Sequence, residues 1–186
     1  MYELGIKKLL RKQENKNFSS PITNIQVEES GRVFATDVKE SVHVLKYKPE
    51  EAQLYIFADD VLKRFVTNFC LLDNDTMAGV DKFENMFVNR LPAGCEDDAE
   101  DDPTATKFKW ENGYLNGAAF KMDAIAQFYM GEVGTQISKA CLNSHGGQEM
   151  VLTSTTMGGL NAFVPFEARE DVEFFSHLEM YLRIEA

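Results

Sequence analysis

The feature that most constrains this chain is a segment that recurs along it. Residues 77–91 contain two short apolar runs joined by a polar turn, a pattern typical of a β-hairpin. Residues 33–47 repeat this pattern, with Asp37 aligned on Asp81, and residues 151–165 are a weaker third copy. The chain therefore repeats one hairpin-forming unit.

The intervals between the copies indicate the kind of repeat. Asp81 lies 44 positions after Asp37, and Thr155 lies 74 positions after Asp81; the surplus of 30 falls largely in the acidic, turn-rich residues 93–117. Four-stranded propeller blades recur every ~40–45 residues. Helical repeats need long apolar stripes of period 3.6, and none precedes residue 167. The sequence therefore predicts an all-β chain, a partial β-propeller of about three to four WD40-like blades of four antiparallel strands each.

Strand boundaries follow from the apolar runs and the turn residues between them. The expected strands are 22–28, 32–38, 41–48 and 53–59 in the first full blade, 65–72, 76–80, 85–91 and 124–130 in the second, and 135–142, 148–154 and 160–166 in the third. A fourth strand of the third blade is missing. Alternation over Tyr2, Leu4 and Ile6 predicts a further, half-buried strand.

The periodicity changes after Pro165, where apolar residues recur at helical spacing. Carboxylates near the start of this segment favour a helix N-terminus. We therefore divide the chain into a partial propeller over residues 1–166, with an acidic insertion at 93–117, and a C-terminal α-helix over residues 167–186.

The charge balance restricts the possible partners. The 19 basic and 30 acidic residues give a net charge of −11, which disfavours broad electrostatic binding to nucleic-acid phosphates. The one basic cluster, residues 7–16, lacks stacking aromatic residues, and we interpret it as a solvated strand and turn. No apolar run is long enough to span a membrane, and no secretory signal is expected at the N-terminus. The three widely spaced cysteines indicate reduced thiols of a cytosolic or nuclear protein.

The acidic loop, residues 95–103, carries six carboxylates in the eight positions from 95 to 102. A calcium loop needs carboxylates at alternate positions around a glycine and a distal glutamate, and this loop does not provide them. We expect a solvated or partner-binding loop. Trp110, the only tryptophan, either anchors the insertion on the blade or serves as an interface hot spot.

No catalytic constellation can be assembled from the sequence. His43, His145 and His177 lie in unrelated surroundings, and no His/Cys pair has metal-ligand spacing. The glycine pairs at 146–147 and 158–159 resemble hairpin turns rather than phosphate loops. We predict no catalytic, cofactor-binding or metal-binding residue, no cofactor and no small-molecule substrate. The residues indicate a scaffold or recognition module.

Several motifs resemble a known family. In order along the chain they are Leu9-Leu-Arg-Lys-x-Glu-Asn-Lys16, Ile56-Phe-Ala-Asp-Asp60, Leu71-Leu-Asp-x-Asp-Thr76, Ala78-Gly-x-Asp-Lys-Phe83, Asp101-x-Pro-Thr104, Leu115-Asn-Gly-Ala118, Val164-Pro-Phe166 and Phe174-Phe-x-His-x-Glu-Met-x-Leu-Arg183. Together they resemble the splicing factor 3B subunit 3 family, in its last β-propeller. Damaged-DNA-binding protein 1 and the large subunit of the cleavage and polyadenylation specificity factor belong to the same wider family.

The resemblance implies a nuclear, non-enzymatic scaffold of the splicing factor 3B complex, within the U2 small nuclear ribonucleoprotein that recognises the intron branch site during pre-mRNA splicing. The implied partners are the helical-repeat subunit and small subunits of that complex, with RNA contacted only indirectly. Family members are several times longer, so we expect this chain to be a fragment. The chain departs from the expected family pattern at two places. Glu84 stands where a turn favours glycine, and the segment that begins at Cys95 is more acidic than expected.

Two other functions stay open at this point. One is a cullin-type ubiquitin-ligase adaptor, as damaged-DNA-binding protein 1 is. The other is an enzyme that uses a metal bound by Asp97, Asp98, Asp101 and Asp102 of the acidic loop. An incomplete ring also exposes strand edges, so we expect the isolated chain to self-associate.

Overall fold

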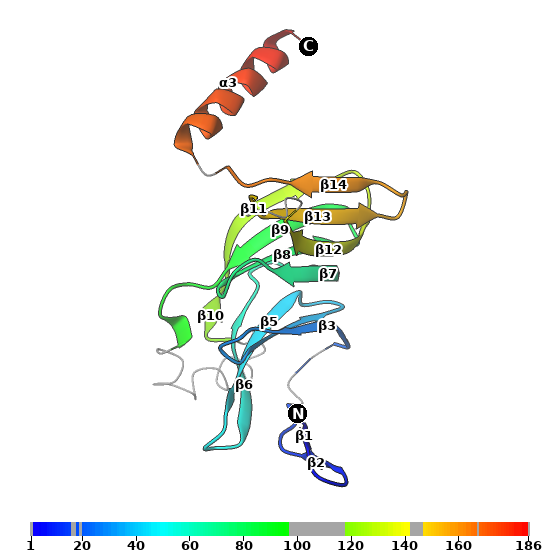
Figure 1. Ribbon diagram of the computed structural model, residues 1–186, viewed down its shortest axis with the longest axis vertical. Helices are drawn as coiled ribbons and strands as arrows, with labels where there is room; N and C mark the ends of the chain where they lie inside the picture. The colour runs from blue at the N-terminus through cyan, green and yellow to red at the C-terminus, as the bar shows by residue number, and fades with distance from the viewer. Residues whose placement is uncertain are drawn as a thin grey trace.

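The computed structural model describes residues 2–15, 18, 20–96, 118–141, 147–166 and 168–185. Within these residues the chain forms strands β1 to β14 and one long helix, α3 (Figure 1). The strands are β1 (Tyr2–Leu4), β2 (Leu9–Arg11), β3 (Ile22–Val27), β4 (Arg32–Asp37), β5 (Val42–Lys48), β6 (Gln53–Asp59), β7 (Val66–Leu71), β8 (Thr76–Asp81), β9 (Asn85–Arg90), β10 (Phe120–Lys121), β11 (Asp123–Tyr129), β12 (Gly134–Ala140), β13 (Met150–Thr155) and β14 (Leu160–Phe163), and the helix is α3 (Arg169–Glu185).

Three antiparallel sheets follow one another along the chain, which confirms the expected mostly-β, propeller-like fold. The first sheet has the order β10-β6-β5-β4-β3, in which the short edge strand β10 alone is parallel to its neighbour, the second has the order β11-β9-β8-β7 and the third β12-β13-β14. Figure 1 shows the three sheets stacked in succession, with α3 projecting beyond β14 at one end of the molecule. Among the described residues the third sheet has three strands.

The second sheet lies between the other two, which explains why every residue of β8 is buried. Met77 packs with residues of the first sheet in one core cluster, whereas Ala78 and Val80 pack with Ile137 of the third sheet in another. Successive side chains of a strand point to opposite faces of its sheet. A single apolar run in β8 therefore supplies both layers of the core.

Glycine permits the close approach of the third sheet to the second. A Cβ at Gly134, the first residue of β12, would lie 2.7 Å from the Cβ of Val80, closer than side-chain atoms pack. At Gly79, within β8, a Cβ would lie 2.4 Å from Cζ of Phe87. The ring of Phe87 fills the space that Gly79 leaves, on the face turned toward the first sheet.

The first strands of the three sheets lie side by side, and a polar ladder crosses them. Asn24 Nδ2 of β3 donates to Asn68 Oδ1 of β7 at 3.1 Å, and Asn68 Nδ2 donates to Gln136 Oε1 of β12 at 2.8 Å. β3 contacts β7, and β7 contacts β12. The sheets therefore share one inner wall, as blades of a propeller do.

Several expected boundaries require correction. The expected strand at Tyr2 and Leu4 is present as β1 of the β1-β2 hairpin, but these side chains are exposed rather than half-buried, and Ile6 lies beyond the strand. The last strand ends at Phe163 instead of residue 166, because the chain then turns toward α3. β10, which pairs in parallel with β6, is not predicted by the sequence pattern. The other strand predictions agree with the structure to within two residues at each described end.

Candidate interaction surface

The repeated turn is organised by the side chain that begins it. Asp81 Oδ1 accepts hydrogen bonds from the backbone N–H groups of Phe83 and Asn85, at 2.7 and 3.0 Å. These bonds hold Glu84 in the left-handed region, at φ 67°, which few residues other than glycine adopt readily. Glu84 therefore stands where the backbone favours glycine, and the hydrogen bonds to Asp81 stabilise this conformation.

The other two copies of the turn also begin with a side chain that accepts backbone N–H groups, although the left-handed residue of the first copy is Ser41, at φ 80°, one aligned position later than Glu84. Asp37 Oδ1 accepts from the N–H of Lys39 at 2.9 Å, and Thr155 Oγ1 accepts from the N–H of Gly159 at 2.9 Å. Gly158, which aligns with Glu84, also has a positive φ of 87°. The alignment of Asp37, Asp81 and Thr155 made from the sequence is confirmed. We call the end of the sheets that carries turns 37–41, 81–85 and 155–159 the turn end.

A buried ion pair joins the first two sheets at the turn end. Arg64 Nη1 pairs with Asp60 Oδ2, and the two side chains are 4% and 1% exposed. Ser41 Oγ donates to the same oxygen at 2.6 Å, and Arg64 Nη2 donates to Gln127 Oε1 at 3.0 Å. The guanidinium also lies 4.3 Å from the ring centroid of Phe87. Because the two charges are desolvated and hydrogen-bonded to both sheets, this network holds turn 37–41 of the first sheet against β11 of the second.

Backbone hydrogen bonds hold the loops of the turn end within their own sheets. The N–H of Lys82 donates to Phe65 O at 3.0 Å, that of Met130 to Glu84 O at 2.7 Å, and that of Thr156 to Val133 O at 3.0 Å. The large apolar side chains exposed on these loops are Val61, Leu62, Phe83 and Met157, with Tyr129 at the adjoining end of β11. A group of exposed apolar side chains on rigid turns is typical of a protein–protein contact.

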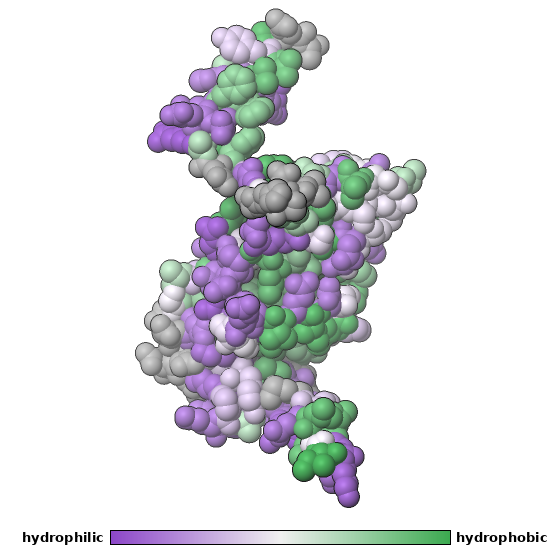
Figure 2. Space-filling model, viewed as in Figure 1, coloured by the Kyte–Doolittle hydropathy of each residue, from purple (hydrophilic) through white to green (hydrophobic). Residues whose placement is uncertain are grey.

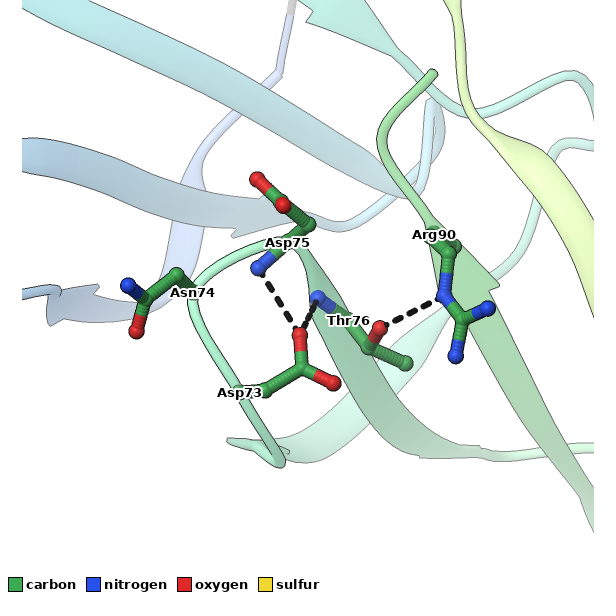
Figure 3. A pocket seen from close by; sticks show the side chains of 5 residues that line it. All are labelled: Asp73, Asn74, Asp75, Thr76 and Arg90. Carbon is green, nitrogen blue, oxygen red and sulfur yellow. Dashed lines mark hydrogen bonds between the residues drawn. The ribbon is translucent and has the colours of Figure 1, made fainter. Parts of the chain in front are cut away.

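The opposite end of the sheets is polar and already satisfied internally. Figure 3 shows a shallow hollow lined by five residues there, Asp73, Asn74, Asp75, Thr76 and Arg90. The carboxylate of Asp73 caps its own turn through the N–H groups of Asp75 and Thr76, and Arg90 Nε donates to Thr76 Oγ1 at 2.9 Å. Burial alone would raise the pKa of Asp73, but these hydrogen bonds lower it below its ordinary value.

The first residues of the acidic loop are fixed to the first sheet. Cys95 is buried, and the Glu96 carboxylate pairs with Arg32 of β4 and Lys46 of β5. Burial favours a raised pKa for Glu96, yet the hydrogen bonds from Lys46 and Arg32 lower it. The rest of the acidic loop, including Asp97, Asp98, Asp101 and Asp102, lies outside the described residues, as does Trp110.

The structure does not bring the histidines together. His43 is buried in β5, where its Nε2 lies 3.1 Å from Asp37 Oδ2, and His177 is exposed on α3, whereas His145 lies outside the described residues.

Burial raises the pKa of Cys70 to about 11, which keeps that thiol protonated and unreactive at neutral pH. No group of three His, Cys, Asp or Glu side chains in the described part of the chain is placed to hold a metal.

Two apolar surfaces lie outside the turn end. Figure 2 shows hydrophobic side chains on the projecting α3 and on the β1-β2 hairpin. On α3, Phe174, Leu178 and Tyr181 lie on one face and are each more than two-fifths exposed. Phe166 stacks on Phe175, with the ring centroids 5.0 Å apart. Of the helices described, none is both long and apolar enough to cross a membrane.

Comparison with known proteins assigns the chain to a family. The model of the CPSF A subunit region matches residues 1–186. The chain belongs to this family. It is 49% identical over 183 residues to the probable splicing factor 3B subunit 3 of Dictyostelium discoideum, covering 98% of this chain and 14% of that protein. It is 48% identical to the spliceosome-associated protein 130 A of Arabidopsis thaliana and 47% identical to the splicing factor 3B subunit 3 of Drosophila melanogaster, covering 100% of this chain and 15% of each relative.

These relatives confirm the resemblance inferred from the motifs. The chain spans about a seventh of the length of the curated relatives it matches. The features that sequence reasoning missed are the Asp60–Arg64 ion pair and the polar ladder over the first strands. The repeated dipeptides Thr23-Asn24 and Thr67-Asn68, which are 44 positions apart, would have indicated the ladder.

Proposed function

We propose that this chain is part of a non-catalytic β-propeller scaffold subunit of the splicing factor 3B complex, and that it acts in pre-mRNA splicing through protein–protein contacts. The observation that carries the proposal is a sequence identity of 45–49%, over 98–100% of this chain, to proteins named splicing factor 3B subunit 3 or spliceosome-associated protein 130. A role in branch-site recognition and prespliceosome assembly, in the nucleus, follows from that assignment.

The turn end is the surface that we assign to these contacts. Phe83 and Met157 stand on turns that Asp81 and Thr155 cap, and the N–H of Leu62 donates to Asp60 Oδ1 at 3.1 Å. Little conformational entropy is therefore lost when a partner binds. The partners are the helical-repeat subunit and the small subunits of the complex. RNA is reached only through these partners, because a chain of net charge −11 repels phosphates.

Affinity purification from nuclear extract tests the proposal. Tagged wild-type chain is expected to recover splicing factor 3B subunits, and a variant with Leu62→Ser and Phe83→Ser is expected to recover roughly tenfold less, because exposed anchors carry most binding energy. Ile6→Ser, which removes a fully exposed apolar side chain from the β1-β2 hairpin, is the control and is expected to bind as wild type does. Recovery of a cullin instead would support the ubiquitin-ligase adaptor and overturn the splicing assignment.

A further inference from the structure

The chain crosses between sheets at residues 118–122. β9 and β11 are neighbours in the second sheet, yet the segment that enters β11 first runs along the edge of the first sheet as β10. Phe120 and Lys121 pair in parallel with Ala58 and Asp59 of β6, and the N–H of Met122 donates to Asp59 O at 2.8 Å. Segment 118–122 therefore ties the first sheet to the second.

One fully buried carboxylate fastens this segment. The Asp59 side chain is 0% exposed; its Oδ2 accepts from the N–H of Ala118 at 3.2 Å, and its Oδ1 pairs with Lys121 Nζ. Lys121 is 40% exposed at the side chain. An ionised carboxylate without water is costly unless a counter-charge offsets it. The charge on a half-exposed lysine thus stabilises a buried charge within the segment that joins the sheets.

The neighbouring charges are already engaged with other groups. On β5, His43 lies opposite Asp59 in the strand register and bonds to Asp37 of β4. After β6, Asp60 pairs with Arg64. Of the cations in the described part of the chain, Lys121 is the one in direct contact with Asp59.

We propose that Asp59 and Lys121 form a charge-operated latch, so that loss of the lysine charge releases segment 118–122 from the first sheet at neutral pH. Any modification that neutralises the Lys121 amine would act in this way. The latch goes beyond the proposed splicing role and does not depend on it.

The latch has a defined pH dependence. Burial raises the pKa of Asp59 to about 6, despite the opposing effects of Lys121, the N–H of Ala118 and His43. When the segment opens, water reaches Asp59 and its pKa falls toward the ordinary value of 3.8. The closed state therefore binds a proton more tightly, and closure is favoured as the pH falls from about 6 toward 4. Well above pH 6 the Asp59 carboxylate is ionised in both states, and the charge of Lys121 then stabilises the closed state most strongly.

Hydrogen exchange of the Ala118 and Met122 amides, expressed as protection factors, tests the latch. At pH 7.5, Lys121→Gln is expected to lower both protection factors roughly tenfold relative to wild type. At pH 5 the loss is expected to shrink below about threefold, because Asp59 is then protonated in the closed state. Lys12→Gln, which removes the exposed ion pair with Glu3, is the control and is expected to leave both amides unchanged.

A second variant separates the latch from a general loss of stability. Asp59→Asn keeps an acceptor for the N–H of Ala118 but removes the buried charge, so adding it to Lys121→Gln is expected to restore protection at pH 7.5. Equal losses at both pH values, or no recovery in the double variant, would overturn the proposal. If Lys121→Gln does not fold at pH 7.5, refolding at pH 5 or in the double variant supports the latch, and failure under both conditions contradicts it.

Discussion

At the scale of single residues, the repeated turn depends on one buried acceptor in each copy. Asp81 is 2% exposed and accepts two backbone N–H groups, besides two contacts from the Asn85 side-chain amide. Such bonds compensate the positive φ of Glu84, which an ordinary residue adopts at a cost of about 1 kcal/mol or more. Asp81 thus stabilises a turn that has glutamate, rather than glycine, at its left-handed position.

Replacing Asp81 separates hydrogen bonding from charge. Asp81→Ala is expected to lower the free energy of unfolding by about 2 kcal/mol, because the buried N–H groups of Phe83 and Asn85 lose their acceptor. Asp81→Asn retains an amide oxygen and is expected to cost less than half as much. Urea unfolding gives both values, with Glu51→Ala, at an exposed turn, as the control. Equal effects of the alanine and asparagine variants would contradict a capping role.

At the scale of elements, each sheet begins with the same irregular strand. β3, β7 and β12 each have a shift in register beside a threonine, at Thr23, Thr67 and Thr135. The Thr67 hydroxyl lies 2.6 Å from Gly134 O of the third sheet, and that of Thr23 lies 3.5 Å from Val66 O of the second. A β-bulge re-aims a side chain, and here it brings the hydroxyls of Thr23 and Thr67 within reach of the next sheet.

These threonines are expected to differ in energetic weight. Thr67→Val keeps the shape of the side chain but removes the bond to the third sheet, and is expected to lower the free energy of unfolding by about 1–2 kcal/mol. The Thr135 hydroxyl contacts Ser154 within its own sheet at an exposed position, so Thr135→Val is expected to cost under about 0.5 kcal/mol. Thermal and urea unfolding measure both. A larger effect at Thr135 would show that the bulge does not act between sheets.

The strands were predictable because each alternates between core and solvent or is bounded by turn residues such as Ser30-Gly31. β10 was not predictable from the sequence, because two residues are too few to show a hydrophobic alternation. Its pairing also depends on the edge of β6, which exists only in the folded first sheet. The third copy of the bulge was obscured by spacing. Thr135 follows Thr67 by 68 positions, whereas Thr155 follows Asp81 by 74, so the first hairpin of the third sheet is six residues longer.

The candidate surface was less predictable than the fold. Val61 and Leu62 lie in the connection from β6 to β7 and Met157 lies in turn 155–159, so no local sequence motif places them at the same end of the sheets. The pairing of Asp60 with Arg64, four residues away, resembles an ordinary solvated pair in sequence. The two charges are buried because the first two sheets pack around them, and a local sequence pattern does not predict such packing.

At the scale of the whole molecule, the third sheet leaves one face and one edge without a described neighbour. Val151 and Thr153 of β13 are buried toward the second sheet, so by alternation Leu152 points to the outer face. Leu160 of β14 shares that face and is 75% exposed. Propellers remove such edges by closing the ring, and an exposed apolar edge strand templates association.

We therefore expect the isolated chain to self-associate through β14. The weight-average mass from sedimentation is expected to rise with concentration, and the variant with Leu160→Lys and Ala162→Lys is expected to associate at least roughly tenfold more weakly, because charged side chains blunt an edge strand. Met157→Lys with Val61→Lys adds the same charge at exposed positions outside the edge and controls for the change in net charge. If wild-type chain remains monomeric at all concentrations, or if both double variants behave alike, the β14 edge is not the site of association.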